Sequence, residues 1–300
     1  MICFTSKTLS ATLGVMFLSA ALTVPAMAAE SLHHVHGLAY SADGKQLLIP
    51  AHYGIAVYAN GRWNKMPGPD HDYMGFSVTR EYFYSSGHPA QGANLVNPLG
   101  LIRSRDMGRS WDKLGLEGEA DFHLLATGYG SNAVYVFNPH PNSRMKGSGI
   151  YATVNQGLSW RRAEAKGLDG EPMALAVHPT DNQVVAAATQ TGGFISSDGG
   201  SSFRSLLKGR QTLAMFFDHD GTNLWVSAYA GKPLLSRMDW KTGKQTAVAL
   251  PPLERDAVAY VAQNPVDRGE YAIATFERSV FISKDRGKSW RQIADRGQAR

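Results

Sequence analysis

The feature that most constrains this chain is an eight-residue pattern that occurs four times. Each copy has a Ser or Thr, an Asp or Asn two places on, a Gly two places later, and then a Ser followed by an aromatic residue. The copies lie at 104–111 (SRDMGRSW), 153–160 (TVNQGLSW), 196–203 (SSDGGSSF) and 283–290 (SKDRGKSW). Oxygen atoms of Asp and Asn accept hydrogen bonds from the backbone of tight turns, and Gly tolerates the positive φ of such turns. The pattern therefore predicts four equivalent turns, organised by Asp106, Asn155, Asp198 and Asp285.

The spacing of the copies predicts the architecture. Their final aromatic residues recur roughly every 45 residues, which is the period of a β-propeller blade. A shortened relative ends at Trp63, and the last interval is long enough for two repeats, so we assign a degenerate copy to 239–243 (DWKTG). The sequence thus contains six repeats. Because no amphipathic helical pattern follows the first residues, we expect an all-β, six-bladed β-propeller with four-stranded antiparallel blades.

Each repeat divides into short apolar segments separated by turn dipeptides such as Asp43-Gly44 and Asn60-Gly61. The first repeat predicts strands at 35–41, 46–52, 54–59 and 62–66. The second predicts strands at 75–80, 82–86, 99–104 and 110–114, and the third at 122–127, 133–138, 149–153 and 159–163. The last three repeats begin near Met173, Thr212 and Ala257, and the sixth ends with 289–295.

The first 28 residues have the features of a secretory signal peptide. They combine Lys7, an apolar run at 9–24 and small residues at 26–28, and we expect cleavage after Ala28. This predicts a periplasmic or secreted protein with one propeller domain at 29–300. The apolar run is short for a membrane span, and no other stretch is long enough for one. Cys3, the only cysteine, lies in this segment, so the mature domain is expected to depend on its core rather than on disulfides.

Charge gives little indication of a partner. The formal net charge is +5, and the Lys and Arg residues are scattered without forming a run. We therefore expect no nucleic-acid partner and at most a modest preference for acidic ligands. A monomer is the expected state.

The ten histidines are unevenly placed. In a propeller, the segments that enter the first strand of each blade and the loops that join its second and third strands share one face. Six histidines fall at these points, as one pair in each of the first three repeats: His36 and His52, His71 and His88, His123 and His140. We expect them to converge on one face. His33 and His34 precede the first strand on the same side, and the sequence leaves open whether they join the group. His178 and His219 fall in turns of the opposite face and are interpreted as turn residues.

Neutral imidazole is the commonest metal ligand in proteins, and a set of histidines without sulfur suits zinc or copper. One histidine at a strand end is usually just hydrogen-bonded, but the repetition in three repeats favours a site. We therefore predict a copper or zinc site with His36, His52, His71, His88, His123 and His140 as candidate ligands. Asp70, Asp72 and Asp121 are neighbouring ligands or hydrogen-bond acceptors, and Met74 is a soft ligand if the ion is copper.

Two long loops on the same face, 89–98 and 141–148, are predicted to form a rim. Arg144 and Lys146 in the second loop would be available to hold an anion.

The eight-residue pattern resembles the Asp-box, or BNR, repeat of sialidases and sortilin-like propellers. With the stretches HVHGL, DYMGF and EADFHLL, most of the chain is similar to a group of secreted bacterial Asp-box propellers classed as glycosyl hydrolases. The resemblance implies that the four turns join the third and fourth strands of a blade and belong to the scaffold. Sialidases hold their substrate with three arginines, and here no arginine begins the first strand in an Arg-Ile-Pro setting. Sialidase activity is therefore not expected.

Two alternatives to metal binding remain open. A glycoside hydrolase would need two carboxyl groups roughly 5–10 Å apart, and the candidates are Asp72, Asp121, Glu171, Asp256 and Glu277, with the first three preferred. A sortilin-like propeller would instead bind an envelope protein. The ligand of the face is thus a metal ion, a small anionic or carbohydrate molecule, or a protein.

Overall fold

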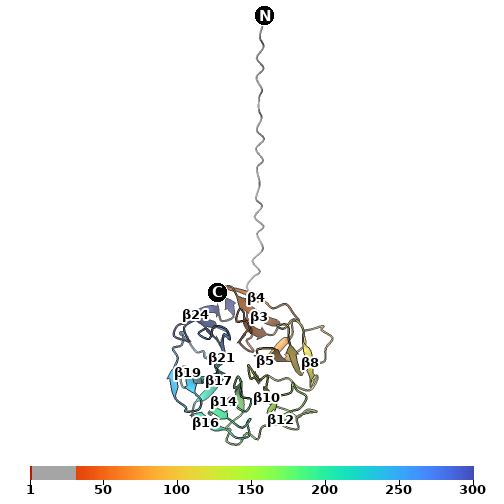
Figure 1. Ribbon diagram of the computed structural model, residues 1–300, viewed down its shortest axis with the longest axis vertical. Helices are drawn as coiled ribbons and strands as arrows, with labels where there is room; N and C mark the ends of the chain where they lie inside the picture. The colour runs from red at the N-terminus through yellow and green to blue at the C-terminus, as the bar shows by residue number, and fades with distance from the viewer. Residues whose placement is uncertain (2–31) are drawn as a thin grey trace.

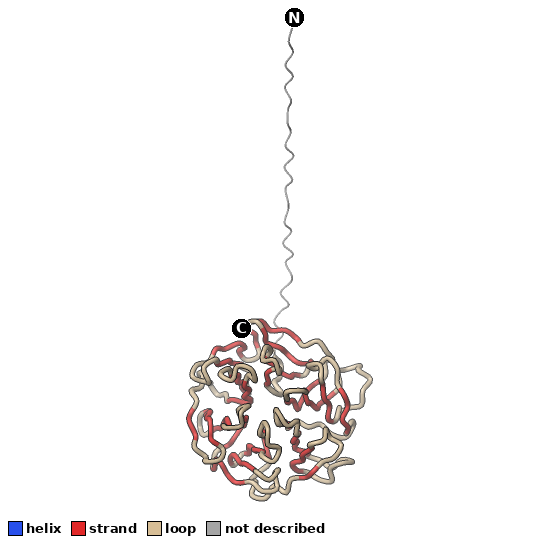
Figure 2. The backbone as a smooth tube through the Cα atoms, viewed as in Figure 1, coloured by secondary structure: helices blue, strands red, loops and turns tan. Residues whose placement is uncertain are grey.

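The computed structural model describes residues 32–300 together with Met1, and in these residues the chain forms six antiparallel sheets around a central axis (Figure 1). Each sheet is built from consecutive strands, and the described residues contain strands and loops without any helix (Figure 2). The predicted all-β, six-bladed propeller is confirmed. Most of the predicted signal peptide, 1–28, lies outside the described residues. Among the described residues, no helix is long and apolar enough to cross a membrane.

The strands of the six blades follow the chain in order. Blade 1 contains β1 (Ala39–Tyr40), β2 (Leu47–Ala51), β3 (Gly54–Ala59) and β4 (Arg62–Lys65); blade 2 contains β5 (Asp72–Val78), β6 (Phe83–His88), β7 (Leu101–Ser104) and β8 (Asp112–Gly115). Blade 3 contains β9 (Leu125–Thr127), β10 (Val134–Asn138), β11 (Gly149–Thr153) and β12 (Arg161–Arg162); blade 4 contains β13 (Pro172–Val177), β14 (Val185–Thr189), β15 (Gly192–Ser196) and β16 (Arg204–Lys208). Blade 5 contains β17 (Gln211–Phe217), β18 (Asn223–Tyr229), β19 (Pro233–Asp239) and β20 (Gln245–Ala247); blade 6 contains β21 (Val258–Gln263), β22 (Tyr271–Thr275), β23 (Val280–Ser283), β24 (Arg291–Asp295) and β25 (Gln298–Ala299).

Strand bounds differ from the predicted ranges in several blades, among them β9 and β12, which are shorter than predicted, and two further differences affect the architecture. β1 is much shorter than the predicted 35–41, and Pro50 explains why: continuing the register of Ala39 with Leu48 would require a backbone N–H that proline lacks. One bond, from the His36 N–H to the Pro50 carbonyl (3.1 Å), continues the contact beyond β1. In blade 6, β25 pairs with β24 as a fifth strand that the repeat pattern did not predict.

The four predicted turns join the third and fourth strands of blades 2, 3, 4 and 6. Asp106 accepts hydrogen bonds from the Ser110 hydroxyl (2.6 Å), the Ser110 N–H (2.9 Å) and the Ser104 hydroxyl (2.8 Å). These bonds, above all the one from the Ser110 side chain, lower the pKa of Asp106 to about 2. The degenerate copy is also such a turn, since Asp239 accepts from the backbone of Lys241 and Thr242 between β19 and β20. The pattern is therefore a scaffold feature.

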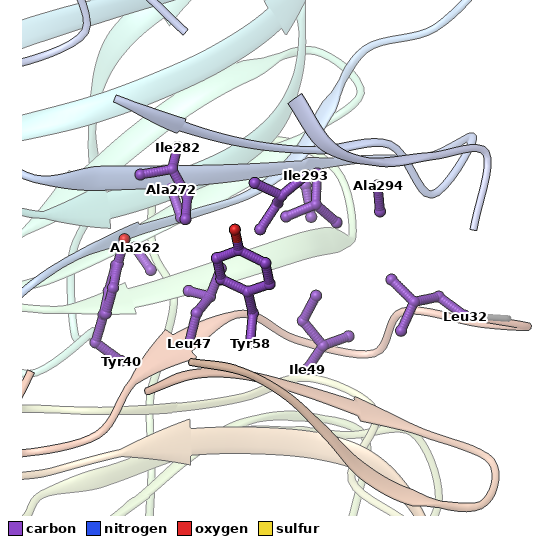
Figure 3. Close-up of a cluster of buried hydrophobic side chains, with 12 residues drawn as sticks. Leu32, Tyr40, Leu47, Ile49, Tyr58, Ala262, Ala272, Ile282, Ile293 and Ala294 are labelled. Carbon is purple, nitrogen blue, oxygen red and sulfur yellow. The ribbon is translucent and has the colours of Figure 1, made fainter. Parts of the chain in front are cut away.

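The ring closes between blade 6 and blade 1 by side-chain packing, because each blade is a continuous segment of chain. Ile49 of blade 1 and Ile293 of blade 6 are fully buried in one apolar cluster, and Leu32 covers its edge (Figure 3). The indole N–H of Trp63 also donates to the Ile293 carbonyl across this junction (2.8 Å).

A cavity of about 250 Å³ lies among the first strands of the blades. Its walls are mainly apolar and include Leu38, Leu125 and Leu175. His36 and His123, which precede β1 and β9, line it where those strands begin, whereas His219 lines it beyond the end of β17. The predicted histidine face is thus one end of this axial cavity.

Candidate metal centre

Three histidines of blade 1 meet at this end of the cavity. One ring nitrogen from each of His34, His36 and His52 lies within 4.8 Å of the others. The rings of His34 and His52 are 4.1 Å apart between centroids, and those of His36 and His52 are 4.8 Å apart. This is the only group of at least three potential metal-ligating side chains with such mutual proximity in the described residues.

The first hairpin of blade 1 brings these residues together. The β1–β2 register pairs Ala39 with Leu48, and its continuation sets His36 beside the end of β2, where His52 follows Ala51. His34 stands two residues before His36, and residues at this spacing on an extended chain point to the same side. The hairpin therefore holds three imidazoles at its open end.

Asp72, the first residue of β5, orients one of these rings. Its Oδ2 atom lies 2.7 Å from Nδ1 of His52, and its Oδ1 atom lies 3.8 Å from Nε2 of His36. The short contact places the hydrogen of neutral His52 on Nδ1, which leaves the Nε2 lone pair available to a ligand. This is the carboxylate–histidine arrangement that commonly supports a metal-bound imidazole.

Burial keeps His36 uncharged at neutral pH. It lowers the pKa of His36 to about 4, and the opposing attraction of Asp72 does not overcome it. Nε2 of His36 is buried and has no hydrogen-bond partner among the described residues. A buried nitrogen without a partner carries a desolvation cost that a bound cation would remove.

A second group of side chains surrounds Asp121. Nε2 of His123 lies 2.7 Å from Oδ2 of Asp121, and Nε2 of His88 lies 3.1 Å from the same oxygen. Nδ1 of His88 lies 2.7 Å from Oδ1 of Asn97, in the loop between β6 and β7. His88 is also the register partner of Asp72 across β5 and β6, so the two groups flank one strand pair.

Close backbone packing positions this second group. Phe122 is fully buried, and its N–H donates to the Ser86 hydroxyl of β6 (2.9 Å). Its carbonyl approaches Gly75 of β5 so closely that a Cβ atom there would lie 2.0 Å from the oxygen. Asp121 and His123 flank Phe122 and are therefore held beside blade 2.

The other predicted site residues lie outside both groups. His71 is buried, and its Nδ1 accepts the N–H of Ala90 (3.0 Å), which fixes the start of the loop at 89–98. The ring of His140 is exposed, and Glu171 is exposed just before β13. Neither side chain makes a hydrogen bond or ion pair within the described part of the chain. Asp70 pairs with Lys65 (2.7 Å).

The loop at 141–148 is anchored to blades 2 and 3. Met145 is fully buried, and the Arg144 guanidinium donates to the carbonyls of Leu114 and Gly157. Lys146 is exposed. In this arrangement the Arg144 side chain fixes the loop to its neighbours.

The two histidines assigned to the opposite face are turn residues. His178 contacts the Gly221 carbonyl through Nε2 (3.2 Å), and His219 contacts the Gln263 carbonyl (2.9 Å). Sequence reasoning left the role of His34 open, and the signal for it was the His-X-His spacing with His36.

Comparison with known proteins establishes the fold. No protein-family model matches the chain, and no curated protein matches it. A GH74 enzyme of Niastella koreensis has a TM-score of 0.61 and 14% identity over 89% of this chain and 46% of that chain. A nidogen/laminin complex gives a TM-score of 0.60 and 11% identity over 85% of this chain and 95% of that one, and YCF48 bound to a D1 peptide gives 0.52 and 16% over 89% and 83%.

The chain spans about half the length of the GH74 enzymes it matches. At these identities the similarity shows a shared propeller architecture. The likeness of the turns to Asp-boxes remains a resemblance.

Proposed function

We propose that this protein is a periplasmic or secreted propeller that binds a transition-metal ion, copper or zinc, through His34, His36 and His52. The observation that supports this most is the convergence of three imidazole nitrogens within 4.8 Å at the end of the axial cavity. Nε2 of His36 is buried without a partner among the described residues, and a carboxylate orients the ring of His52.

The spacing is compatible with a metal after a small adjustment. Nitrogen ligands about 2.0 Å from a tetrahedral ion are roughly 3.3 Å from one another. The three nitrogens would therefore have to approach by up to about 1.5 Å. His34 is exposed and precedes the first strand, so its ring can make most of this movement.

The donor set favours copper or zinc. It consists of imidazoles without thiolate, and copper(II) binds such sites more tightly than zinc in the usual affinity order. Asp72 would serve as the hydrogen-bond acceptor that holds His52, and Met74, half-buried in β5, is the nearest thioether in sequence. The role we propose is metal binding or handling, and a bound ion at this site could also polarise a substrate oxygen or water.

The test is elemental analysis after loading with copper(II) or zinc and removal of free metal. His36→Ala and His52→Ala should each release the ion from this site, because each removes one of three ligands. His140→Ala is the matched control, since its ring is exposed and outside the cluster. Equal metal content in the wild type and both cluster variants would contradict the proposal.

A glycoside hydrolase-like activity is the second candidate. It is supported by the fold similarity to GH74 enzymes and by Asp72 and Asp121, two carboxylates that each contact a histidine. It predicts release of reporter from an aryl glycoside, lost in Asp72→Asn or Asp121→Asn. Cleavage by the metal-free protein would rank this function above metal binding. Glu171→Gln tests the remaining predicted carboxylate.

A protein-binding role is the third candidate. Two of the similar propellers were solved with a peptide or protein partner. It predicts co-purification with one envelope protein that a chelator does not disrupt. Loss of that partner on chelation would favour the metal instead.

A further inference from the structure

The axial cavity of about 250 Å³ is itself a candidate binding site. We propose that it binds a small, neutral aromatic molecule of one or two rings. This inference goes beyond metal binding, because His34 and His52, two of the three proposed metal ligands, are not among the residues that line the cavity. The two proposals can therefore be tested separately.

Three first strands add a side chain to the cavity wall. In β13, β17 and β21 the register with the second strand of the blade shifts by one residue, so that Met173, Leu213 and Ala259 have no register partner there. Each of these three residues lines the cavity. A β-bulge redirects a side chain and is common beside functional sites. The same irregularity near the start of three consecutive blades therefore indicates that it shapes this wall.

The wall carries apolar surface that the described part of the chain does not cover. Leu38, Met173 and Tyr260 line the cavity and are only half-buried, although they lie in or directly before the innermost strands. Because the first strand of each blade faces the axis, the exposed part of these side chains is turned toward the cavity. Apolar surface in contact with water favours a ligand that covers it.

The wall provides no formal charge for a ligand. None of the described residues that line the cavity is an Asp, Glu, Lys or Arg. The hydroxyl groups of Ser77 and Thr127 bond to each other between blades 2 and 3 (2.7 Å). Burial lowers the pKa of His36 to about 4, so this ring is uncharged at neutral pH. A charged ligand would lose its hydration here without gaining a partner, and the cavity therefore favours neutral molecules.

The volume sets the size of the ligand. An apolar cavity of about 150 Å³ is large enough to bind benzene. The axial cavity, at about 250 Å³, can thus accommodate a molecule of one or two rings, such as indole.

The side chains of the wall favour an aromatic ligand. Phe76, Phe216 and Tyr260 line the cavity, and aromatic rings attract one another in edge-to-face and offset-stacked arrangements. Met173 adds a thioether, which also makes favourable contacts with aromatic rings. An aromatic ligand is therefore expected to bind this wall more tightly than an aliphatic ligand of the same size.

Aromatic rings also line both ends of the cavity. Beyond the ends of β9 and β17, the rings of Tyr129 and His219 lie 4.1 Å apart between centroids, and both residues line the cavity. At the histidine end, Phe276 lines the cavity and is 56% exposed. A ligand would thus meet aromatic side chains at each end.

The experiment is a calorimetric titration of the metal-free mature protein with indole in the presence of a chelator. The wild type should bind one indole per chain, with a negative heat-capacity change because apolar surface is buried. Benzoate, a charged aromatic molecule, should bind at least tenfold more weakly than indole. His52→Ala, which lacks a proposed metal ligand, should bind indole as the wild type does.

Two variants fill the cavity. Ala259→Phe and Ala174→Leu each place a larger side chain in the wall, and each should weaken indole binding at least tenfold. Ala247→Phe is the matched control, because Ala247 is exposed in β20 and does not line the cavity, and it should leave the affinity unchanged. Circular dichroism establishes which variants are folded.

The outcomes separate this proposal from metal binding. Absence of saturable indole binding would overturn the aromatic site and leave the metal centre untouched. Wild-type affinity in a folded Ala259→Phe or Ala174→Leu variant would place indole elsewhere on the protein and would also overturn it. Benzoate binding as tight as that of indole would contradict a site for neutral molecules. Indole binding by a protein that retains no copper or zinc after loading would support the cavity and overturn the metal centre.

Discussion

Replacing Asp72 by Asn is a sharp test of how the blade 1 cluster is organised. The substitution keeps the size of the side chain and an oxygen that can accept the Nδ1–H of His52, which now lies 2.7 Å from the carboxylate. It removes the negative charge that makes His52 a stronger donor through Nε2. The carboxylate does not need to be a ligand for this effect to occur.

The expected magnitude follows from the role of such a carboxylate. Mutating the carboxylate behind a metal-bound histidine typically weakens metal affinity about 10–100-fold, which corresponds to roughly 1.4–2.7 kcal/mol. His52 is the only one of the three imidazoles in direct hydrogen-bond contact with Asp72, because the His36 nitrogen is 3.8 Å away. We therefore expect Asp72→Asn to weaken binding within this range rather than abolish it.

The assay is competition for copper(II) or zinc against a chromogenic chelator, in the wild type and in Asp72→Asn. Asp70→Asn is the matched control, because Asp70 is two residues away and pairs with Lys65. It should change affinity less than threefold. An Asp72→Asn affinity equal to that of the wild type would refute the positioning role, and complete loss of binding would show that Asp72 is itself a ligand.

Three further predictions concern the scaffold. The pKa of Asp106 is about 2, below its usual value, so its contribution to stability is complete above a pH of about 4 and is lost as the pH falls toward 2. Asp106→Asn should therefore make the free energy of unfolding depend less on pH between about 4 and 2 in acid denaturation. Burial lowers the pKa of His219 to about 4, so the unfolded chain takes up a proton at a higher pH than the folded chain does. The free energy of unfolding should therefore fall as the pH is lowered from about 6.5 to 4. His219→Gln should reduce this slope in denaturant titrations at different pH values, without changing metal content. Ile49→Ala at the blade 1–blade 6 junction should lower the free energy of unfolding by about 2–5 kcal/mol, whereas Leu158→Ala in an exposed turn should change it by less than about 0.5 kcal/mol in urea titrations.

Most of the fold could be predicted from the repeat pattern. Turn residues act through local hydrogen bonds, so Asp106 and its equivalents could be placed between the third and fourth strands from the sequence alone. The degenerate copy at 239–243 was found by the same reasoning, because Asp239 still caps its turn. β25 could not be predicted, since it lies beyond the last repeat and depends on pairing with β24.

The sequence predicted which face of the propeller carries the candidate site, but not which side chains contact one another there. The repeated position of histidines in three blades indicated that they share one end of the propeller. Which rings meet depends on side-chain packing: Pro50 shortens β1, and Gly75 admits the Phe122 backbone that carries Asp121. Local packing also decides the role of His71, which accepts a hydrogen bond from the Ala90 N–H instead of joining either group. The division into two groups, each with its own carboxylate, is a property of the folded chain.

The most direct test of the central claim is the metal content of the mature protein after copper loading, measured by mass spectrometry with and without His36→Ala/His52→Ala. The account predicts that the double variant contains at least one ion per chain less than the wild type while remaining folded. Identical metal content in the two proteins would contradict the blade 1 centre, and a wild type that retains no copper or zinc would contradict metal binding at this face altogether.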